Sequence, residues 1–312
     1  MGRLLITGYN GLIGSQFENS DAIVFNSKVC DLRNQKDTDF MIDFYTDKET
    51  KGEYAVDRII HCAAKVGGVG YNMSHKGEFF YDNIMINTNI IEAARKGGVK
   101  NMVVFLSTCI FPDDVEYPLT ESKIHLGEPH PSNDGYAYAK RMADIQVRAY
   151  REQYGLNYKC VIPTNVYGIN DNFNLESGHV IPALIHKCYL AKRDDTPFEV
   201  WGSGKPLREF IYNKDVATLT EWVLDNYEEE EPIILSTSEE VSIKGVVEMI
   251  VELMGFEGEV IWKSDSPDGQ YRKPTDNSKI RGYLPDFEFT SLYDGLKETI
   301  EWFNEKYPNI RK

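Results

Sequence analysis

Short apolar runs alternate with longer, helix-compatible stretches along the first half of the chain. The runs cover residues 3–6, 22–25, 56–60, 102–106 and 158–162, and several are rich in Val and Ile. Strands that are apolar throughout are typical of parallel sheets covered on both faces, and parallel strands need crossover connections of this length. We therefore predict an α/β protein whose first half contains a doubly wound parallel sheet.

The second half has a less regular pattern and is interrupted by prolines. We expect Asp215 to cap a helix that reaches about residue 226, and a strand to follow over residues 232–235. A helical apolar stripe near the C-terminus comprises Leu292, Leu296, Ile300 and Phe303. The expected organisation is a first domain over residues 1–165 and a smaller mixed α/β domain over residues 166–312, with roughly 212–236 returning to the first domain.

The chain is acidic, with a formal net charge of −15 over 312 residues. Such a charge repels polyanions, so we expect neither nucleic acid nor a membrane as a partner, and an anionic ligand would need locally placed cations. The five cysteines lack paired metal-ligand spacing, which indicates free thiols and no metal site. With no leader sequence and no apolar stretch that could span a bilayer, we expect a cytoplasmic protein.

A glycine-rich loop directly follows the first apolar run. Its sequence is Gly8-Tyr9-Asn10-Gly11-Leu12-Ile13-Gly14. Glycines allow a tight turn and close backbone approach, and a helix that begins here would direct its N–H groups at a pyrophosphate. A plain glycine turn is the alternative, but the position after a strand favours a Rossmann-like, dinucleotide-binding first domain.

The end of the second run bears on which dinucleotide would bind. It reads Asn26-Ser27-Lys28, with no carboxylate to bind a ribose 2′-hydroxyl. Ser27 and Lys28 suit a 2′-phosphate, so we favour NADP(H) over NAD, and we expect Asp31 and Leu32 to lie against the adenine. An ordinary polar strand end is the alternative interpretation of these residues.

Ser107, Tyr136 and Lys140 give the strongest chemical signal. Ser107 ends an apolar run, and Tyr136 and Lys140 lie about one helical turn apart. A carbonyl that receives a hydride needs a proton donor and a second hydrogen bond, and an ammonium beside a tyrosine favours the ionised phenol. A long loop rich in turn residues, 112–134, separates the two motifs.

Cys109 and His179 form a second candidate pair. Burial as a small apolar residue is the default interpretation of Cys109, and a lone histidine is often structural. However, Cys109 lies two residues after Ser107, so its thiol would reach the same substrate, and His179 has the pKa range of a complementary acid. Both alternatives stay open on the local sequence alone.

Three residues of the second half are candidates for binding an anionic nucleotide. Lys187 and Arg208 could hold a diphosphate, and Trp201 could stack on a base. The alternative is a surface ion pair and a core tryptophan.

Longer motifs are dispersed over most of the chain. They are Ala63-Ala64-Lys65-Val66-Gly67-Gly68, Leu106-Ser107-Thr108-Cys109-Ile110-Phe111-Pro112, Tyr136-Ala137-Tyr138-Ala139-Lys140-Arg141, Ile162-Pro163-Thr164-Asn165-Val166-Tyr167-Gly168, Asp171-Asn172-Phe173, Gly178-His179-Val180-Ile181-Pro182 and the run from Trp201 to Phe210. In these segments the chain resembles the GDP-L-fucose synthase family of extended short-chain dehydrogenases/reductases. Tyr9 and Asn10 depart from the smaller residues usual in that loop.

The resemblance implies an enzyme that converts GDP-4-keto-6-deoxy-D-mannose to GDP-L-fucose by C3 and C5 epimerisation and NADPH-dependent reduction at C4. In that family Tyr136 would be the proton donor supported by Lys140 and Ser107, with Cys109 as base and His179 as acid. NADP would contact the glycine loop, Ala63, Ala64, Leu106, Ser107, Thr108, Lys140, Pro163, Thr164, Asn165, Val166 and His179. The GDP-sugar would contact Lys187, Trp201, Arg208 and Asp268.

Family membership further implies a homodimer, formed through the Tyr136 helix and a helix over residues 77–96. Other functions are weighed against this one. A nucleotide-sugar dehydratase would have an acidic pair where Cys109 and Ile110 stand, and a simple 4-epimerase needs no such thiol. A noncatalytic NADP-sensing module would not need Tyr136 and Lys140 together.

Overall fold

The chain forms a six-stranded parallel sheet with strand order β2-β1-β3-β4-β5-β9, in which five strands come from residues 3–163 and the sixth from residues 233–235. The computed structural model describes residues 2–18, 21–263 and 270–312. The strands of this sheet are β1 (Arg3–Thr7), β2 (Ile23–Phe25), β3 (Val56–His61), β4 (Asn101–Phe105), β5 (Asn157–Pro163) and β9 (Ile233–Leu235). The predicted α/β class and doubly wound parallel sheet are confirmed.

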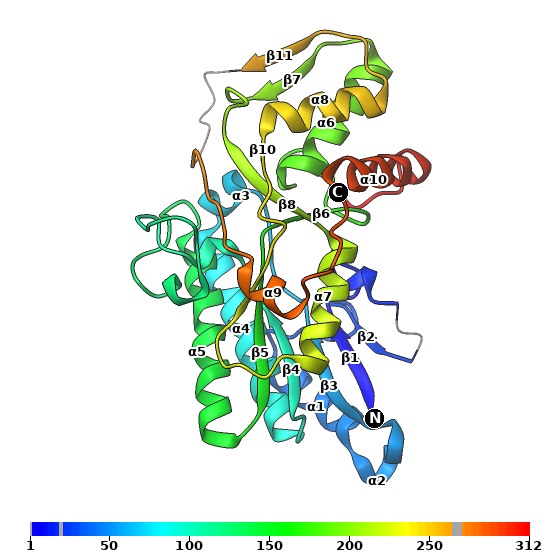
Figure 1. Ribbon diagram of the computed structural model, residues 1–312. Coiled ribbons are helices and arrows are strands. Elements are labelled where there is room, and N and C mark those ends of the chain that lie inside the picture. Colours follow the sequence, from blue (N-terminus) through cyan, green and yellow to red (C-terminus); the bar gives the residue numbers. More distant parts are fainter. Residues whose placement is uncertain (1, 19–20, 264–269) are drawn as a thin grey trace.

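Helices cover both faces of this sheet (Figure 1). The helices concerned are α1 (Gln35–Thr46), α4 (Lys76–Lys96), α5 (Asp134–Tyr154) and α7 (Asn213–Asn226). Alternate residues of β4 show how the faces divide: Met102 and Val104 pack with α4 and α5, whereas Val103 and Phe105 pack with α7. Because both faces are buried, the strand is apolar from Met102 to Phe105, which is the pattern seen in the sequence.

The remaining elements form a second part that lies above the large sheet in Figure 1. It contains a three-stranded sheet of order β10-β8-β6 and the parallel pair β11-β7. The strands are β6 (Asn165–Tyr167), β7 (Phe198–Trp201), β8 (Leu207–Tyr212), β10 (Glu240–Ser242) and β11 (Val260–Lys263), and the helices are α6 (Val180–Asp194), α8 (Ile243–Met254) and α10 (Leu292–Lys306). The predicted stripe of α10 is confirmed, since Leu296, Ile300 and Phe303 are buried in one core with residues of α6 and α8.

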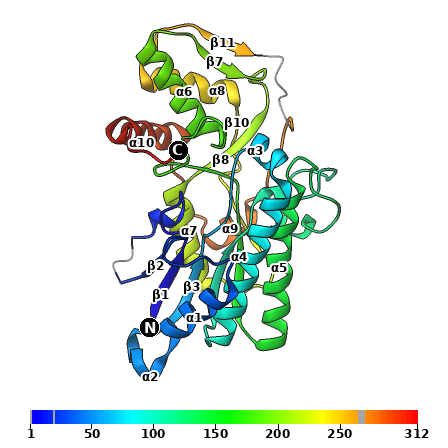
Figure 2. The ribbon, with the colours of Figure 1, turned by 180° about the vertical axis from the view of Figure 1, so that it is seen from behind.

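The chain passes between the two parts more than once. It leaves the large sheet after β5, returns through α7 and β9, and crosses again to the second part (Figure 2). This path supports, as a proposal, the division at about residue 165 with a return over 212–236. Short elements complete the described chain: α2 (Lys48–Lys51), α3 (Val69–Ser74), α9 (Ser278–Tyr283), and the 3-10 helices η1 (Gly14–Gln16), η2 (Gly52–Tyr54), η3 (Thr108–Ile110) and η4 (Glu121–Lys123).

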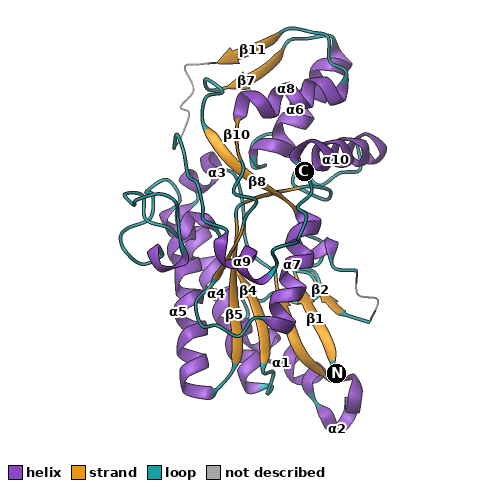
Figure 3. Ribbon diagram, viewed as in Figure 1, coloured by secondary structure: helices purple, strands orange, loops and turns teal. Residues whose placement is uncertain are grey.

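The segment between β4 and α5 is mostly loop, as predicted, and carries only η3 and η4 (Figure 3). One backbone prediction is wrong: Asp215 does not cap α7. The helix begins at Asn213, and the buried Asp215 carboxylate instead accepts hydrogen bonds from the backbone N–H and the hydroxyl of Thr290 at 2.8 and 2.9 Å. Its partner is 75 residues away, which a local pattern cannot show.

The glycine loop also departs from expectation. It leads into η1, a 3-10 helix of three residues, and the described residues up to β2 contain no α-helix. The expected helix N-terminus is therefore missing from this part of the described chain. The loop itself is tight: Gly8 has a φ of +70°, and a Cβ on Gly14 would come within 2.3 Å of the Gly8 carbonyl oxygen. Only glycine fits at these two positions.

Candidate active site

A continuous cavity of about 1330 Å³ lies at the carboxyl ends of the parallel strands, bordered by the second part of the molecule. This edge of a doubly wound sheet is the usual place for a nucleotide ligand. Most of the candidate residues from the sequence line it: Gly8, Asn10, Gly11, Leu12, Ile13, Gly14, Ser27, Lys28, Asp31, Leu32, Ala63, Ala64, Leu106, Ser107, Thr108, Cys109, Tyr136, Pro163, Thr164, Asn165, Val166, His179, Trp201 and Arg208. Residues up to 200 positions apart thus meet on one surface.

Three of the described candidates are not on this surface. Tyr9 packs against the core cluster between the large sheet and α7. Lys140 is buried directly behind the cavity wall, and Lys187 reaches the ring of the cavity residue Trp201 from outside. Asp268 lies outside the described residues.

Ser107 and Cys109 are joined by the turn that follows β4. Ser107 is the N-cap of η3. Its hydroxyl oxygen accepts a hydrogen bond from the Cys109 thiol, with 3.2 Å between Sγ and Oγ. Burial raises the pKa of the Cys109 thiol, while the Ser107 hydroxyl and the Lys273 and Lys140 ammonium groups oppose that rise. Cys109 therefore rests as a thiol, beside three groups that stabilise a thiolate.

Tyr136 and Lys140 lie on one face of α5. The Lys140 Nζ is 5.9 Å from the centre of the Tyr136 ring and donates to the Phe105 carbonyl oxygen at 2.8 Å. Burial lowers the pKa of Lys140 to about 8. Burial raises the pKa of Tyr136, and the nearby Cys109 raises it further. Burial therefore outweighs the effect expected of the Lys140 ammonium on Tyr136, and the phenol carries the proton that a donor needs.

His179 stands immediately before α6, with its side chain exposed at the cavity. Two hydrogen bonds from backbone to side chain shape the loop before it. The Asp171 carboxylate accepts one from the Asn172 N–H at 2.7 Å, and the Asn172 side-chain oxygen accepts one from the Asn174 N–H at 3.2 Å. Although the imidazole faces the cavity, the cavity walls shield it from bulk water, and this desolvation lowers the pKa of His179. The positive charge of Arg311 lowers the pKa further. The imidazole is therefore mainly neutral near pH 7.

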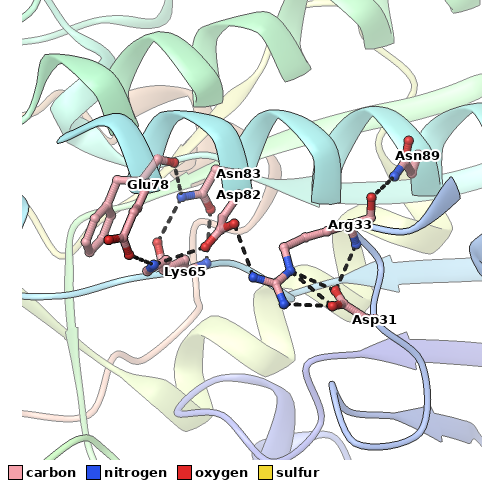
Figure 4. Close-up of polar contacts among 8 residues, drawn as sticks. Asp31, Arg33, Lys65, Glu78, Asp82, Asn83 and Asn89 are labelled. Atoms are coloured by element: carbon pink, nitrogen blue, oxygen red, sulfur yellow. Dashed lines mark hydrogen bonds and ion pairs between the residues drawn. The ribbon is translucent and has the colours of Figure 1, made fainter. Parts of the chain in front are cut away.

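Charged side chains form a network at the end of the cavity near β2 (Figure 4). The Arg33 guanidinium lies 2.7 Å from the Asp31 carboxylate and 3.2 Å from Asp82. Lys65 joins the same Asp82 at 3.0 Å and Glu78 at 2.7 Å. Asp31 is thus held by Arg33, whereas the neighbouring Lys28 side chain makes no hydrogen bond or ion pair with the described residues.

Cations also gather at the second part. Lys187 Nζ lies 4.1 Å from the centre of the Trp201 ring, and an Arg208 Nη donates to the Leu207 carbonyl oxygen at 2.7 Å. Burial lowers the pKa of Arg208, which is close to Tyr117. The structure thus brings together Lys187 and Trp201, which the sequence predicts to contact a diphosphate and a base.

The sequence reasoning missed several charged residues of the cavity, among them Lys273, Asp171 and Arg311. Lys273 is close to Cys109 and Arg208, and burial lowers its pKa. Burial raises the pKa of Asp171 to about 7. Asp171 belongs to the Asp171-Asn172-Phe173 motif that supports the family resemblance. Lys273 and Arg311 belong to no such motif, so their local sequence does not indicate a role in the cavity. Among the described residues, no cluster of His, Cys, Asp or Glu could hold a metal ion, and no helix is long and apolar enough to cross a membrane.

The fold and this cavity place the chain among known proteins. Residues 4–236 match the NAD dependent epimerase/dehydratase family, to which the chain therefore belongs. The GDP-L-fucose synthase of Dictyostelium discoideum is 45% identical over 320 residues, covering 99% of this chain and 97% of that protein. The probable GDP-L-fucose synthase of Drosophila melanogaster is 40% identical and covers all of both chains.

Solved structures agree with these relatives. A GDP-L-fucose synthetase from Naegleria fowleri bound to NADP has a TM-score of 0.92 and 41% identity, covering 100% of this chain and 95% of that one. Within the wider family, the chain is a member of the GDP-L-fucose synthase family. The resemblance seen in the sequence and the expectation of an enzyme are confirmed.

Proposed function

We propose that this enzyme converts GDP-4-keto-6-deoxy-D-mannose to GDP-L-fucose by epimerising C3 and C5 and reducing C4. The observation that carries the proposal is the convergence of Ser107, Cys109, Tyr136 and His179 on one cavity. A ketone acidifies the protons on its neighbouring carbons, so one oxygen carries negative charge in all three steps. A single set of hydrogen-bond donors can therefore serve the whole sequence.

The cofactor is NADP(H), as the NADP-bound Naegleria relative supports. The residues fit it: a tight glycine loop, an adenine end with Ser27 and Lys28 but no free carboxylate beside them, and room for a second nucleotide. When bound, NADPH supplies the hydride. The chain holds the dinucleotide through the Gly8 to Gly14 loop, the ends of β3 and β4, and the Pro163 to Val166 segment.

In the reduction, Tyr136 donates its phenolic proton to the C4 oxygen. Ser107 gives that oxygen a second hydrogen bond, because its hydroxyl is free to donate while it accepts from Cys109. Lys140 is held by the Phe105 carbonyl oxygen behind Tyr136, so its positive charge offsets the phenolate that forms as the proton leaves.

In the epimerisations, Cys109 removes the C3 and C5 protons and His179 returns a proton from the opposite face. Because both groups rest mainly in their neutral forms, each epimerisation begins with net transfer of the thiol proton to His179, which forms the thiolate base and the imidazolium acid together. Proton removal by the thiolate and proton return by the imidazolium then restore the neutral pair. The Lys273 and Lys140 ammonium groups stabilise that thiolate. Ser107 and Tyr136 stabilise the enolate on the C4 oxygen.

The GDP portion is bound by the cations of the second part. Arg208 and Lys187 balance the diphosphate, and Trp201, exposed on one side and covered by Lys187 on the other, stacks on the guanine. Lys187 lacks the fork of an arginine, so it acts as a point charge. Asp268, outside the described residues, completes the proposed set.

We further propose a homodimer built on α4 and α5. Both helices pack against each other and expose large apolar side chains, including Phe80 and Tyr81 on α4 and Met142 and Ile145 on α5. An exposed apolar surface of this kind is typical of an interface. The five free thiols support a reducing, cytoplasmic location.

The test is a direct assay with purified protein, NADPH and GDP-4-keto-6-deoxy-D-mannose. Loss of NADPH absorbance together with formation of GDP-L-fucose is expected, and GDP-D-mannose, which has no ketone, serves as the control. No loss of absorbance would reject the reductase. Oxidation of NADPH with a product that keeps the manno configuration would reject the epimerase. Formation of a 4-keto-6-deoxy sugar from GDP-D-mannose would favour the dehydratase alternative.

A further inference from the structure

The glycine loop of this enzyme has little positive charge with which to bind a pyrophosphate. No Lys or Arg occurs between Arg3 and Lys28. The described residues after the loop form only the short helix η1, so the positive end of a long α-helix is also missing there. A cation from another part of the chain would therefore complement the backbone N–H groups of the loop.

The C-terminal tail, residues 307–312, brings a cation to the cavity. It runs beside the Asp171-Asn172-Phe173 motif, where the Phe173 N–H donates to the Arg311 carbonyl oxygen at 2.9 Å. The Phe173 ring packs on Phe303 and Trp302 of α10, with ring centres 4.9 and 6.0 Å apart. These contacts fix the tail so that Arg311 lines the cavity.

Arg311 lies on the dinucleotide side of the cavity. Its charge acts on Asp171, and the residue before Asp171, Asn170, donates to Ser15 Oγ in η1 at 3.2 Å. Asn213 ties the same region together, since its side-chain amide donates to both the Leu12 and Ile169 carbonyl oxygens at 2.9 Å. Residues 169–171 therefore border the glycine loop.

The cations of the second part lie on the other side. Arg208 and Lys273 are close to each other and to the loop that carries Asp113 and Tyr117. The charged groups that act on Arg208 and Lys273 do not include Arg311. Arg311 acts instead on Asp171 and His179.

The Arg311 guanidinium is available for a ligand, because it makes no hydrogen bond or ion pair within residues 2–18, 21–263 and 270–312. Arg33 and Lys65, the other cations near this end of the cavity, are already paired with Asp31, Asp82 and Glu78. Asp171 does not cancel the Arg311 charge. Its Oδ2 has no hydrogen-bond partner, and its raised pKa of about 7 leaves much of the carboxyl group neutral.

We propose that Arg311, carried by the C-terminal tail, binds the pyrophosphate of NADP(H) and supplies the positive charge that the glycine loop lacks. The inference rests on the proposed cofactor but not on the sugar chemistry. It gives the tail of this chain a role in cofactor affinity.

The experiment compares Arg311→Gln with Lys312→Gln in the full-length protein. Each variant removes one positive charge from the tail, but Lys312 lies over the Tyr307 ring at 4.8 Å and does not line the cavity. Dissociation constants are measured by titration for NADPH, NADH and GDP. Arg311→Gln is expected to weaken the binding of NADPH and of NADH by the same factor, about tenfold, because the pyrophosphate is common to both. GDP binding, and all three affinities of Lys312→Gln, should match the wild type.

Each other outcome overturns the proposal. Unchanged affinity for both dinucleotides would show that Arg311 is not part of the cofactor site. Weaker binding of NADPH alone would show that Arg311 binds the 2′-phosphate, which is the result expected instead for Lys28→Gln. Weakening of GDP assigns it to the nucleotide-sugar. If Arg311→Gln does not fold, Arg311→Lys is titrated in its place and should weaken both dinucleotides equally. Failure of the sugar assay with intact, Arg311-dependent NADPH binding would reject the proposed function while this inference stands.

Discussion

The Cys109 thiol donates its hydrogen bond to the Ser107 hydroxyl, with 3.2 Å between Sγ and Oγ. This contact couples the residue proposed for epimerisation to one proposed for reduction. The Ser107 hydroxyl can donate to the substrate oxygen while it accepts from Cys109, so both chemistries use the same hydroxyl.

Replacing Ser107 with Ala is therefore expected to impair both activities. It removes one donor to the C4 oxygen and one stabiliser of the thiolate, and loss of such a donor typically slows catalysis by about 10²- to 10³-fold. Solvent deuterium entry at C3 and C5 and NADPH oxidation should both be measured on the same preparation. Exchange at the wild-type rate with slow reduction would show that Ser107 serves only the reduction.

Two buried lysines allow the role of Lys140 to be separated from its contribution to stability. Lys140 donates to the Phe105 carbonyl oxygen, and Lys159 donates to those of Val223 and Leu224 away from the cavity. Either Lys→Met change removes the hydrogen bonds from a buried ammonium group to backbone carbonyl oxygens and should lower the free energy of unfolding by about 1–3 kcal/mol. Only Lys140→Met should also slow NADPH oxidation, by about 10²-fold or more.

Denaturant titration gives the stability of both variants, and activity is assayed where both remain folded. Equal rates of NADPH oxidation in Lys140→Met and Lys159→Met would show that Lys140 contributes to stability and not to catalysis.

Lys273 is expected to set the reactivity of Cys109. Removing its ammonium in Lys273→Met should raise the pKa of the thiol, so less thiolate is present at any given pH and alkylation slows severalfold. Alkylation is followed against pH by mass spectrometry of the Cys109 peptide. Cys62, whose pKa depends on burial and Lys140 rather than Lys273, is the internal control. An unchanged pH profile for Cys109 would show that Lys273 acts elsewhere.

Asp171 should make the protein less stable as the pH rises. Burial raises its pKa from 3.8 to about 7 in the folded state, so the unfolded chain releases the proton first and stability falls across that interval. Asp171→Asn keeps the acceptor for the Asn172 N–H and removes the charge. We expect the variant to gain on the order of 2 kcal/mol over the wild type between pH 5 and pH 8. A difference that does not vary with pH would mean that the carboxyl group titrates normally.

The sequence predicted the large sheet well because its signals are local. Strands such as β4 are apolar on both faces, and the stripe of α10 repeats with the helical period. Asp215 shows the limit of such signals, because its partner Thr290 is distant in the chain. The glycine loop shows another: the motif is present, but the helix usually expected after it is reduced to η1.

The same limit applies to the site. Ser107, Cys109 and Tyr136 were found because they stand in recognisable motifs, and the fold brings them to one cavity. The direction of their pKa shifts was not predictable, since burial depends on the surrounding chain. Lys273 and Arg311 stand outside the motifs that were quoted, and only the fold places them beside Cys109 and His179.

The central claim is that one cavity performs both epimerisation and reduction, with Cys109 as the base. The most direct measurement is deuterium incorporation at C3 and C5 of GDP-4-keto-6-deoxy-D-mannose in D₂O, for the wild type and Cys109→Ser, with NADPH affinity measured in parallel. The account predicts incorporation at both carbons by the wild type and at neither by Cys109→Ser, with NADPH affinity unchanged. Incorporation by Cys109→Ser at the wild-type rate would contradict it.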